Sequence, residues 1–185
     1  ALKDGRTDLR NLPFVTIDPK TAKDFDDAVC LIEENGKRTL WVAIADVAHY
    51  IEPETLLDEE AQARATSVYL PHAVLPMLPS RLSDNLCSLR SKVPRLAMVV
   101  SMEIKDDFTI GEVSAFESVI EVKENLSYED ALDNPKFQNM MNLAEGLRQN
   151  EIRLNLNSAE LRPRVDDDEI SVNVKWPNKA TEMIE

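Results

Sequence analysis

Four aspartates within ten positions are the residues of this sequence best suited to chemistry. Asp18 follows one apolar stretch, and Asp24, Asp26 and Asp27 directly precede the next. The count alone decides little, because Asp and Glu together make up 34 of the 185 residues. If both apolar stretches are strands, however, the four carboxylates lie at strand ends, where they can share one pocket. Clustered carboxylates repel one another, and burying them is costly unless a cation compensates. Hard oxygen ligands at this density suit Mg²⁺ or Mn²⁺.

The spacing of these aspartates also predicts their local geometry. In a regular strand Asp24 and Asp26 would share one face and Asp27 would point to the other. A shared metal site therefore requires an irregular backbone over residues 24–27, and a straight strand there would exclude it. The EF-hand pattern does not fit, because Val29 stands at the sixth position from Asp24, where that loop needs glycine. The alternative is an acidic loop that caps turns and faces water.

Strands on both sides must position these aspartates. Asp18-Pro19 ends the first, since proline stops strand pairing. Asn35-Gly36 predicts a tight hairpin, because both residues tolerate positive φ. A second hairpin is expected to turn at Asp106-Asp107, and residues 165–169 read as a solvated acidic turn. The predicted strands are 14–17, 28–33, 39–45, 97–104, 112–122 and 170–174.

Helices are predicted in three places. Residues 56–67 form the first, with Thr55 or Asp58 near its cap. A proline-containing loop follows it, and Ser127 then begins an S-x-x-D helix start. Apolar residues at helical spacing predict the third helix over 136–153, with Met140 and Met141 in the core. The fold class is therefore α+β: a mixed, mainly antiparallel sheet with packed helices.

Composition limits the class of protein. The net charge of −13 counts against nucleic-acid binding, because duplex-binding surfaces are usually basic. A hydrophobic share of 43% excludes a disordered acidic tail. No apolar run suits a membrane span or a signal peptide. Cys30 and Cys87 are too few for a disulfide framework, so free thiols and a cytoplasmic location are expected. His49 and His72 lack the close spacing to these cysteines that zinc sites use.

Four long blocks of the chain resemble the RNB catalytic domain of the ribonuclease II / ribonuclease R family. The resemblance covers nearly the whole chain, more weakly after Ser127. It implies an RNB-type fold and the processive hydrolysis of single-stranded RNA from the 3′ end to nucleoside 5′-monophosphates. The blocks are DLRNLPFVTIDPKTAKDFDDAV at 8–29, LWVAIADVAHYI at 40–51, TSVYLPHAVLPMLPSRLSDNLCSL at 66–89 and RLAMVVSMEI at 95–104.

The family's metal motif is an aspartate, five residues and then D-x-D-D. The resemblance places it on Asp18, Asp24, Asp26 and Asp27 and implies that they hold Mg²⁺ or Mn²⁺ at the scissile phosphate. Two such cations can activate water and stabilise the leaving oxygen.

The resemblance also suggests residues that touch RNA. Tyr69 matches a family tyrosine that stacks on the 3′-terminal base, and Tyr128 matches a second aromatic near the RNA path. The alternative for Tyr69 is a half-buried tyrosine beside a proline loop. Arg81 and Arg90, together with Lys92 and Arg95, either meet phosphates or balance nearby acids. The block from Asp46 to His49 is interpreted as structural, and Trp41 as core.

The resemblance implies that residues 1–185 form the first half of the catalytic domain, with residues 1–12 as a polar leading segment. The family's second half, which carries a catalytic arginine, and its flanking OB-type RNA-binding domains have no counterpart here. The isolated chain is therefore expected to be inactive and to expose apolar surface where the second half would pack. The alternative is a catalytically inactive RNB-like fragment that serves as an interaction or metal-binding module.

Overall fold

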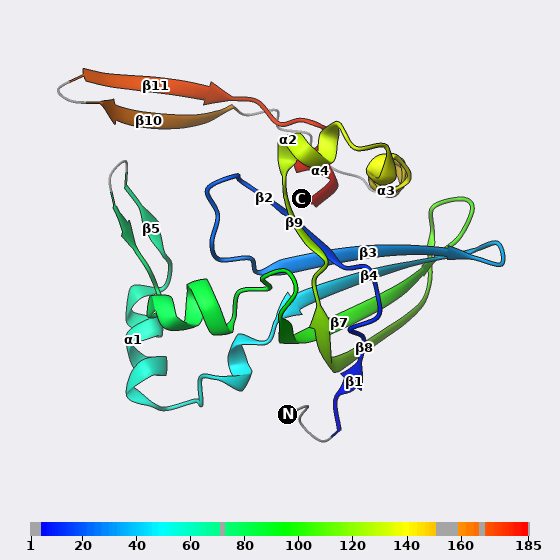
Figure 1. The fold of residues 1–185 in the computed structure, drawn as a ribbon, viewed down its shortest axis with the longest axis horizontal. Helices are drawn as coiled ribbons and strands as arrows, with labels where there is room; N and C mark the ends of the chain where they lie inside the picture. The colour runs from blue at the N-terminus through cyan, green and yellow to red at the C-terminus, as the bar shows by residue number, and fades with distance from the viewer. Residues whose placement is uncertain (1–4, 71–72, 151–158, 167–168, 185) are drawn as a thin grey trace.

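A seven-stranded sheet forms the centre of the protein (Figure 1). The computed structural model describes residues 5–70, 73–150, 159–166 and 169–184. The strand order is β1-β8-β7-β4-β3-β2-β9, with parallel pairing only for β1–β8 and β2–β9. The predicted α+β class with mainly antiparallel pairing is confirmed. The strands are β1 (Thr7–Asp8), β2 (Val15–Asp18), β3 (Asp27–Glu34), β4 (Lys37–Ala45), β7 (Pro94–Ile104), β8 (Ile110–Glu121) and β9 (Glu124–Ser127).

Both predicted hairpins are present in this sheet. Strands β3 and β4 join at Asn35 and Gly36, whose φ angles are 52° and 74°. Both residues therefore lie in the left-handed region, as a tight primed turn requires. Strands β7 and β8 join across residues 105–109, which include the predicted Asp106-Asp107 turn.

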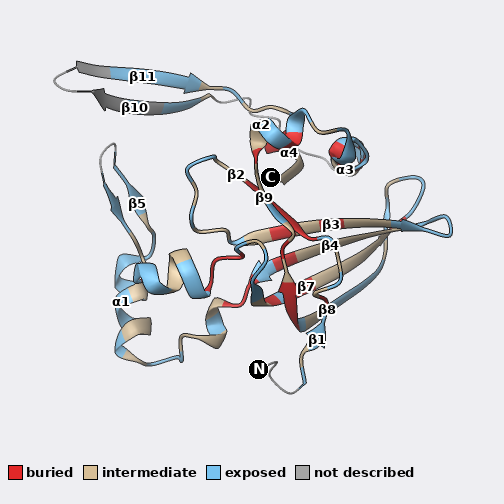
Figure 2. Cartoon of the chain, viewed as in Figure 1, coloured by how far each residue is buried: buried red, intermediate tan, exposed pale blue. Residues whose placement is uncertain are grey.

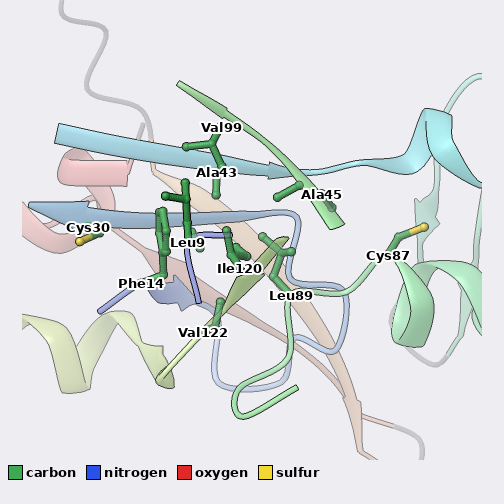
Figure 3. Packing of buried hydrophobic residues seen from close by; sticks show 12 residues of the cluster. Leu9, Phe14, Cys30, Ala43, Ala45, Cys87, Leu89, Val99, Ile120 and Val122 are labelled. Carbon is green, nitrogen blue, oxygen red and sulfur yellow. The ribbon is translucent and has the colours of Figure 1, made fainter. Parts of the chain in front are cut away.

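The main hydrophobic core covers one face of the sheet (Figure 3). Alternate residues of the central strands point into it, and several are alanines, such as Ala28, Ala43 and Ala97. These small side chains let Phe14 and Leu89, which are both fully buried, approach the sheet closely. The segment that contains Leu89 is thereby fixed against the strands.

Both cysteines are buried free thiols, as predicted. Burial raises the pKa of the Cys30 thiol to about 12, and it also raises the pKa of Cys87. Neither sulfur is therefore a ready thiolate nucleophile near neutral pH.

The opposite face of the sheet is apolar and only partly covered. Helices α3 (Gln138–Gln149) and α4 (Lys179–Ile184) lie over part of it and leave a groove of about 340 Å³. Val29, Val42 and Ile44 help to line this groove. Ile44 and its register partner Met98 are exposed. Apolar surface of the kind predicted from the resemblance is thus present on this face.

Helix α1 (Leu56–Arg64) begins as predicted, with Thr55 at its N-cap accepting a hydrogen bond from the Asp58 amide. It ends three residues before the predicted position 67, because Ala65 takes a left-handed φ of 62°. The segment predicted as a proline-containing loop also holds regular structure. It contains the short hairpin β5 (Val68–Tyr69) and β6 (Val74–Leu75) and the π-helical turn η2 (Leu82–Leu86).

The remaining helices lie together near β2 and β9 (Figure 1). Ser127 forms the predicted capping box with Asp130. The predicted helix over 136–153 begins as a 3₁₀ turn, and residues 151–153 lie outside the described residues. Met140 and Met141 are buried, as predicted. The helices are α2 (Tyr128–Leu132), η3 (Pro135–Phe137), α3 (Gln138–Gln149) and α4 (Lys179–Ile184).

A hairpin of β10 (Glu160–Asp166) and β11 (Glu169–Lys175) extends away from the sheet (Figure 1). Strand β11 includes the whole of the strand predicted over 170–174. The acidic turn predicted over 165–169 is wrong at its ends, because Val165, Asp166 and Glu169 pair within the two strands. Buried residues concentrate in the sheet and in the segments next to it (Figure 2). None of the helices in the described residues has the length and apolarity that a membrane crossing requires.

Candidate functional site

The four aspartates gather where β2 ends and β3 begins. Asp18 is the last residue of β2 and Asp27 is the first residue of β3. Asp24 and Asp26 lie between them in backbone that is neither helix nor strand. The irregular backbone predicted over residues 24–27 is therefore confirmed for residues 24–26.

Ser88 holds this irregular segment in place. Its fully buried hydroxyl donates a hydrogen bond to the Lys23 carbonyl at 2.7 Å and accepts one from the Phe25 amide at 3.1 Å. The next residue, Leu89, donates its amide to the Phe25 carbonyl at 2.8 Å. Both neighbours of Asp24 are thus bonded to one short segment of the core, which fixes the backbone that carries Asp24.

Asn125 of β9 links that segment to the strand of Asp18. Its side-chain amide donates to Thr16 Oγ1 at 2.9 Å and to the Leu89 carbonyl at 3.1 Å. Its Oδ1 accepts from the Ser91 amide at 2.8 Å. Thr16 lies two residues before Asp18 in β2, and Leu89 bonds to Phe25 in the segment of the other aspartates. Asn125 therefore couples the two aspartate-bearing segments through Leu89.

Burial and mutual repulsion shift the acidity of the cluster. The pKa of Asp18 rises to about 6, first because burial removes water and next because Asp27 is nearby, with smaller contributions from Asp26 and Asp24. A hydrogen bond with Thr16 acts in the opposite direction. Burial also raises the pKa of Asp26, reinforced by Asp24 and Asp27, and it raises the pKa of Asp27. The carboxylates are therefore close enough to destabilise one another's charge.

The chemistry of this donor set fits a hard divalent cation. All four side chains offer carboxylate oxygens, and Asp18 Oδ2 is buried without a hydrogen-bond partner among the described residues. A cation would compensate that oxygen and relieve the repulsion. As the side chains are placed, however, no three Asp, Glu, His or Cys residues of the described part of the chain are grouped closely enough to hold one ion.

Tyr69 is the predicted RNA-contacting residue that the structure brings to the carboxylates. It lies in β5, and its hydroxyl donates a hydrogen bond to Asp24 Oδ2 at 2.9 Å. This bond is the first cause of its raised pKa. The residue is 66% exposed, so the alternative of a half-buried tyrosine does not hold, and surface remains for stacking.

The other predicted contacts lie around the site. Tyr128 begins α2 directly after Ser127, the register partner of Asp18, and the Lys175 ammonium lies 5.0 Å from the centre of its ring. Arg81 is exposed at the start of η2. Arg90 is exposed and lines a cavity together with Arg95.

Asp46 has a structural role, as the sequence suggested for the block from Asp46 to His49. It is buried and forms an ion pair with Arg6 at 2.5 Å, in which both side chains are at most 7% exposed. Its carboxylate also accepts the His49 amide at 3.1 Å, which caps the 3₁₀ turn η1 (Val47–His49). Trp41 packs edge-on against Phe116 beside the core.

Ser88 and Asn125 are the residues that sequence reasoning missed. Ser88 lies in one of the blocks used for the resemblance and Asn125 lies outside all four, but a lone serine or asparagine carries no pattern that signals its partners. Only their hydrogen bonds to residues 63 and 109 positions away identify them.

Comparisons with known proteins match most of the chain to one domain family. Residues 6–185 match the RNB domain family. The chain is 50% identical over 127 residues to ribonuclease R of Escherichia coli (strain K12), which covers 68% of this chain and 16% of that protein. Ribonuclease R of Vibrio cholerae is 49% identical with the same coverage. This chain thus spans about a sixth of the length of these curated relatives.

A solved structure gives the same result at the level of the fold. The structure of Mycoplasma genitalium RNase R in complex with ribose methylated single-stranded RNA superposes with a TM-score of 0.87 at 32% identity. The match covers 98% of this chain and 31% of that chain. With matches of sequence and of structure both spanning most of its residues, the chain belongs to the RNB domain family.

Proposed function

We propose that this chain is the first half of the catalytic domain of an exoribonuclease. The complete enzyme would hydrolyse single-stranded RNA processively from the 3′ end and release nucleoside 5′-monophosphates. Membership of the RNB family and similarity to ribonuclease R support this proposal. A cytoplasmic location suits the two free thiols, which a reducing compartment preserves.

The carboxylate cluster is the observation that carries the proposal. Asp18, Asp24, Asp26 and Asp27 come together from two strand ends although their charges repel, and one buried oxygen of Asp18 lacks a partner. Such an arrangement is costly in a purely structural role. It is expected where carboxylates hold Mg²⁺ or Mn²⁺ for phosphodiester hydrolysis. The cations, when bound, would supply an activated water and positive charge at the leaving oxygen.

The protein's own residues orient the substrate. The four aspartates would hold the cations, and Asp24 also accepts the hydroxyl of Tyr69. The exposed ring of Tyr69 would stack on the terminal base, which suits an enzyme without sequence preference because every base has a π-face. The family's second half and its OB-type domains would supply the remaining contacts to RNA and the cationic group that stabilises charge at phosphorus.

Replacing Asp26 by Asn tests the proposal in the complete protein that carries this chain. Asparagine has nearly the same size and shape as aspartate, so Asp26→Asn should fold, retain RNA binding and release no mononucleotides. Release of 5′-mononucleotides is measured by chromatography, and RNA binding by fluorescence anisotropy. Asp133→Asn, the same change at an exposed carboxylate after α2, should leave both unchanged. Full hydrolysis by Asp26→Asn would contradict the proposal.

A catalytically inactive RNB-like module is the second candidate. It is favoured by the absence, among the described residues, of three carboxylates placed to hold one ion. Titrating Mg²⁺ into the protein, with and without a short oligo(A) strand, distinguishes the exoribonuclease from the inactive module. Metal binding without RNA binding or nucleotide release would favour the inactive module. Release that requires both Mg²⁺ and Asp26 would establish the enzyme.

A further inference from the structure

A second cavity lies beside the carboxylate segment. It encloses about 870 Å³, and its wall includes Lys23 and Phe25, the two neighbours of Asp24. The opposite wall comes from η2 and from the residues that lead into β7. The polar residues that line it are Lys23, Asp84, Asn85, Arg90, Ser91, Arg95 and Asn125.

The charge of this cavity has the opposite sign to that of the chain. Lys23, Arg90 and Arg95 contribute three positive charges and Asp84 contributes one negative charge, a balance of +2. The chain as a whole carries −13. A positive concavity in an acidic protein concentrates anions locally, and guanidinium groups are particularly suited to phosphate oxygens.

The arginines of the cavity are not neutralised by neighbouring acids. Arg95 is held by neutral oxygens: its Nε donates to the Ser88 carbonyl at 2.9 Å and its Nη2 to Asn85 Oδ1 at 3.3 Å. Neither Arg95 nor Arg90 forms an ion pair with a described residue. Burial lowers the pKa of Arg95, and the charge of Arg90 lowers it further, so the two cations are close enough to repel. An anion between them would relieve that repulsion.

The cavity is coupled rigidly to the carboxylates. Ser88 bonds through its carbonyl to Arg95 and through its hydroxyl to both neighbours of Asp24. The position of the Arg95 guanidinium relative to Asp24 is therefore set by one fully buried residue. A strand whose scissile phosphate lies at the carboxylates would bring neighbouring phosphates within reach of this wall.

We propose that the cavity between η2, β7 and the segment 22–25 is a phosphate-binding site for the backbone of the RNA strand. The proposal rests on the proposed function, because it takes RNA as the ligand. Arg90 is the residue that contacts phosphate most directly, since it is exposed and its side chain has no partner among the described residues. Arg95 orients the wall and adds charge.

RNA binding as a function of salt tests this site. Affinity for a single-stranded oligo(A) is measured in EDTA, so that the result does not depend on hydrolysis, with the complete protein that carries this chain. Loss of one phosphate contact lowers the slope of log affinity against log salt by about 0.7 for a single strand. Arg90→Ala is expected to show that change and to bind roughly tenfold more weakly, the value of one charge-assisted hydrogen bond. Arg90→Lys keeps the positive charge and should therefore keep the wild-type slope of log affinity against log salt.

Lys105→Ala is the matched control. It removes one exposed positive charge at the far end of β7, about 35 Å from the start of that strand, and should leave the slope unchanged. An unchanged slope for Arg90→Ala, or an equal loss for both variants, would overturn the proposal whether or not the protein hydrolyses RNA.

Adenosine 5′-monophosphate distinguishes the source of the phosphate. It is titrated as a competitor of the oligo(A) under the same conditions. Arg90→Ala could lower the affinity for the mononucleotide and leave the affinity for the oligo(A) strand unchanged. In that case the cavity binds the terminal phosphate of a product, and the assignment to the RNA backbone is overturned. If Arg90→Ala lowers the affinity for the oligo(A) strand, the assignment to the RNA backbone holds.

Discussion

Asp18 is held in a place that is unfavourable for its own charge. It lies at the end of a buried strand, its Oδ2 has no hydrogen-bond partner among the described residues, and three other aspartates are nearby. Its pKa of about 6 expresses that cost. A carboxylate in this situation is better suited to binding a cation than to stabilising the fold. Neighbouring Thr16, which opposes the shift through a hydrogen bond, offsets only part of it.

This cost predicts that the stability of the folded, metal-free protein depends on pH. The folded-state pKa of Asp18, about 6, lies above its usual 3.8, so the folded state binds the proton more tightly than the unfolded state. Stability from this group is complete below pH 3.8 and is lost as pH rises through 6. Because Asp18 is only half-buried, solvent screening makes the change in unfolding free energy smaller than the roughly 3 kcal/mol that the full pKa difference would give.

Urea unfolding of the wild type and Asp18→Asn in EDTA, at pH 5 and pH 7.5, measures this effect. The wild type should gain stability on acidification relative to the variant, since the amide does not titrate. With Mg²⁺ at pH 7.5 the wild type should gain stability and Asp18→Asn should gain much less. A pH response identical in the two proteins would contradict the assignment.

The segment between β2 and β3 shows how an element without regular structure can still be fixed. Residues 24–26 have no strand pairing of their own. Their backbone groups bond instead to Ser88 and Leu89 and, at Asp26, to the Ala45 amide at 2.8 Å. The position of this segment therefore depends on the packing of a distant segment against the sheet.

Ser88→Ala should loosen this segment. The change leaves the Lys23 carbonyl and the Phe25 amide without their partner, which costs about 1–3 kcal/mol of unfolding free energy. Because Asp24 lies between them, Mg²⁺ affinity measured by calorimetry should fall as well. Ser118→Ala is the matched control: Ser118 is equally buried, but its hydroxyl makes only a 3.5 Å bond to the Phe116 carbonyl. Equal metal affinity in the two variants would show that Ser88 does not position the aspartates.

At the scale of the whole molecule, the functional charges are separated in space. The net charge of −13 counted against nucleic acid, yet the four clustered aspartates are acids that a metal-dependent nuclease requires. The positive charge gathers in a cavity next to them. The sheet face that carries Ile44 and Met98 remains partly exposed, in keeping with a surface that packs against further structure.

The isolated 185-residue chain should bind Mg²⁺ but release no nucleotides. Within the described residues, none of the four aspartates forms an ion pair, so no cationic side chain contacts the carboxylates themselves to stabilise charge at phosphorus. A thermal-shift titration with Mg²⁺ tests metal binding by the isolated chain. Chromatography after incubation with oligo(A) tests whether it releases nucleotides. Release of mononucleotides by the isolated chain, lost in Asp26→Asn, would show that these residues suffice.

Local patterns in the sequence were enough to predict the central strands and the helices α1 to α3, but not the strands β1, β5, β6, β9 and β10. Asn35-Gly36 required a tight turn because both residues adopt positive φ, and the S-x-x-D pattern at Ser127 required a helix start. The boundary of α1 was wrong by three residues, because nothing in the pattern signalled the left-handed Ala65. The bent backbone at residues 24–26 was predicted from the requirement that side chains of opposite strand faces serve one site.

By itself, the sequence determined which residues are the candidates for the chemistry, since spacing along the chain specified the aspartates and the strands on either side of them. The tertiary structure alone decided what holds those residues and what surrounds them. Ser88 and Asn125 act through hydrogen bonds to residues 63 and 109 positions away, and the positive cavity joins segments from three parts of the chain. Such contacts leave no local pattern, because they depend on which segments the buried core brings together.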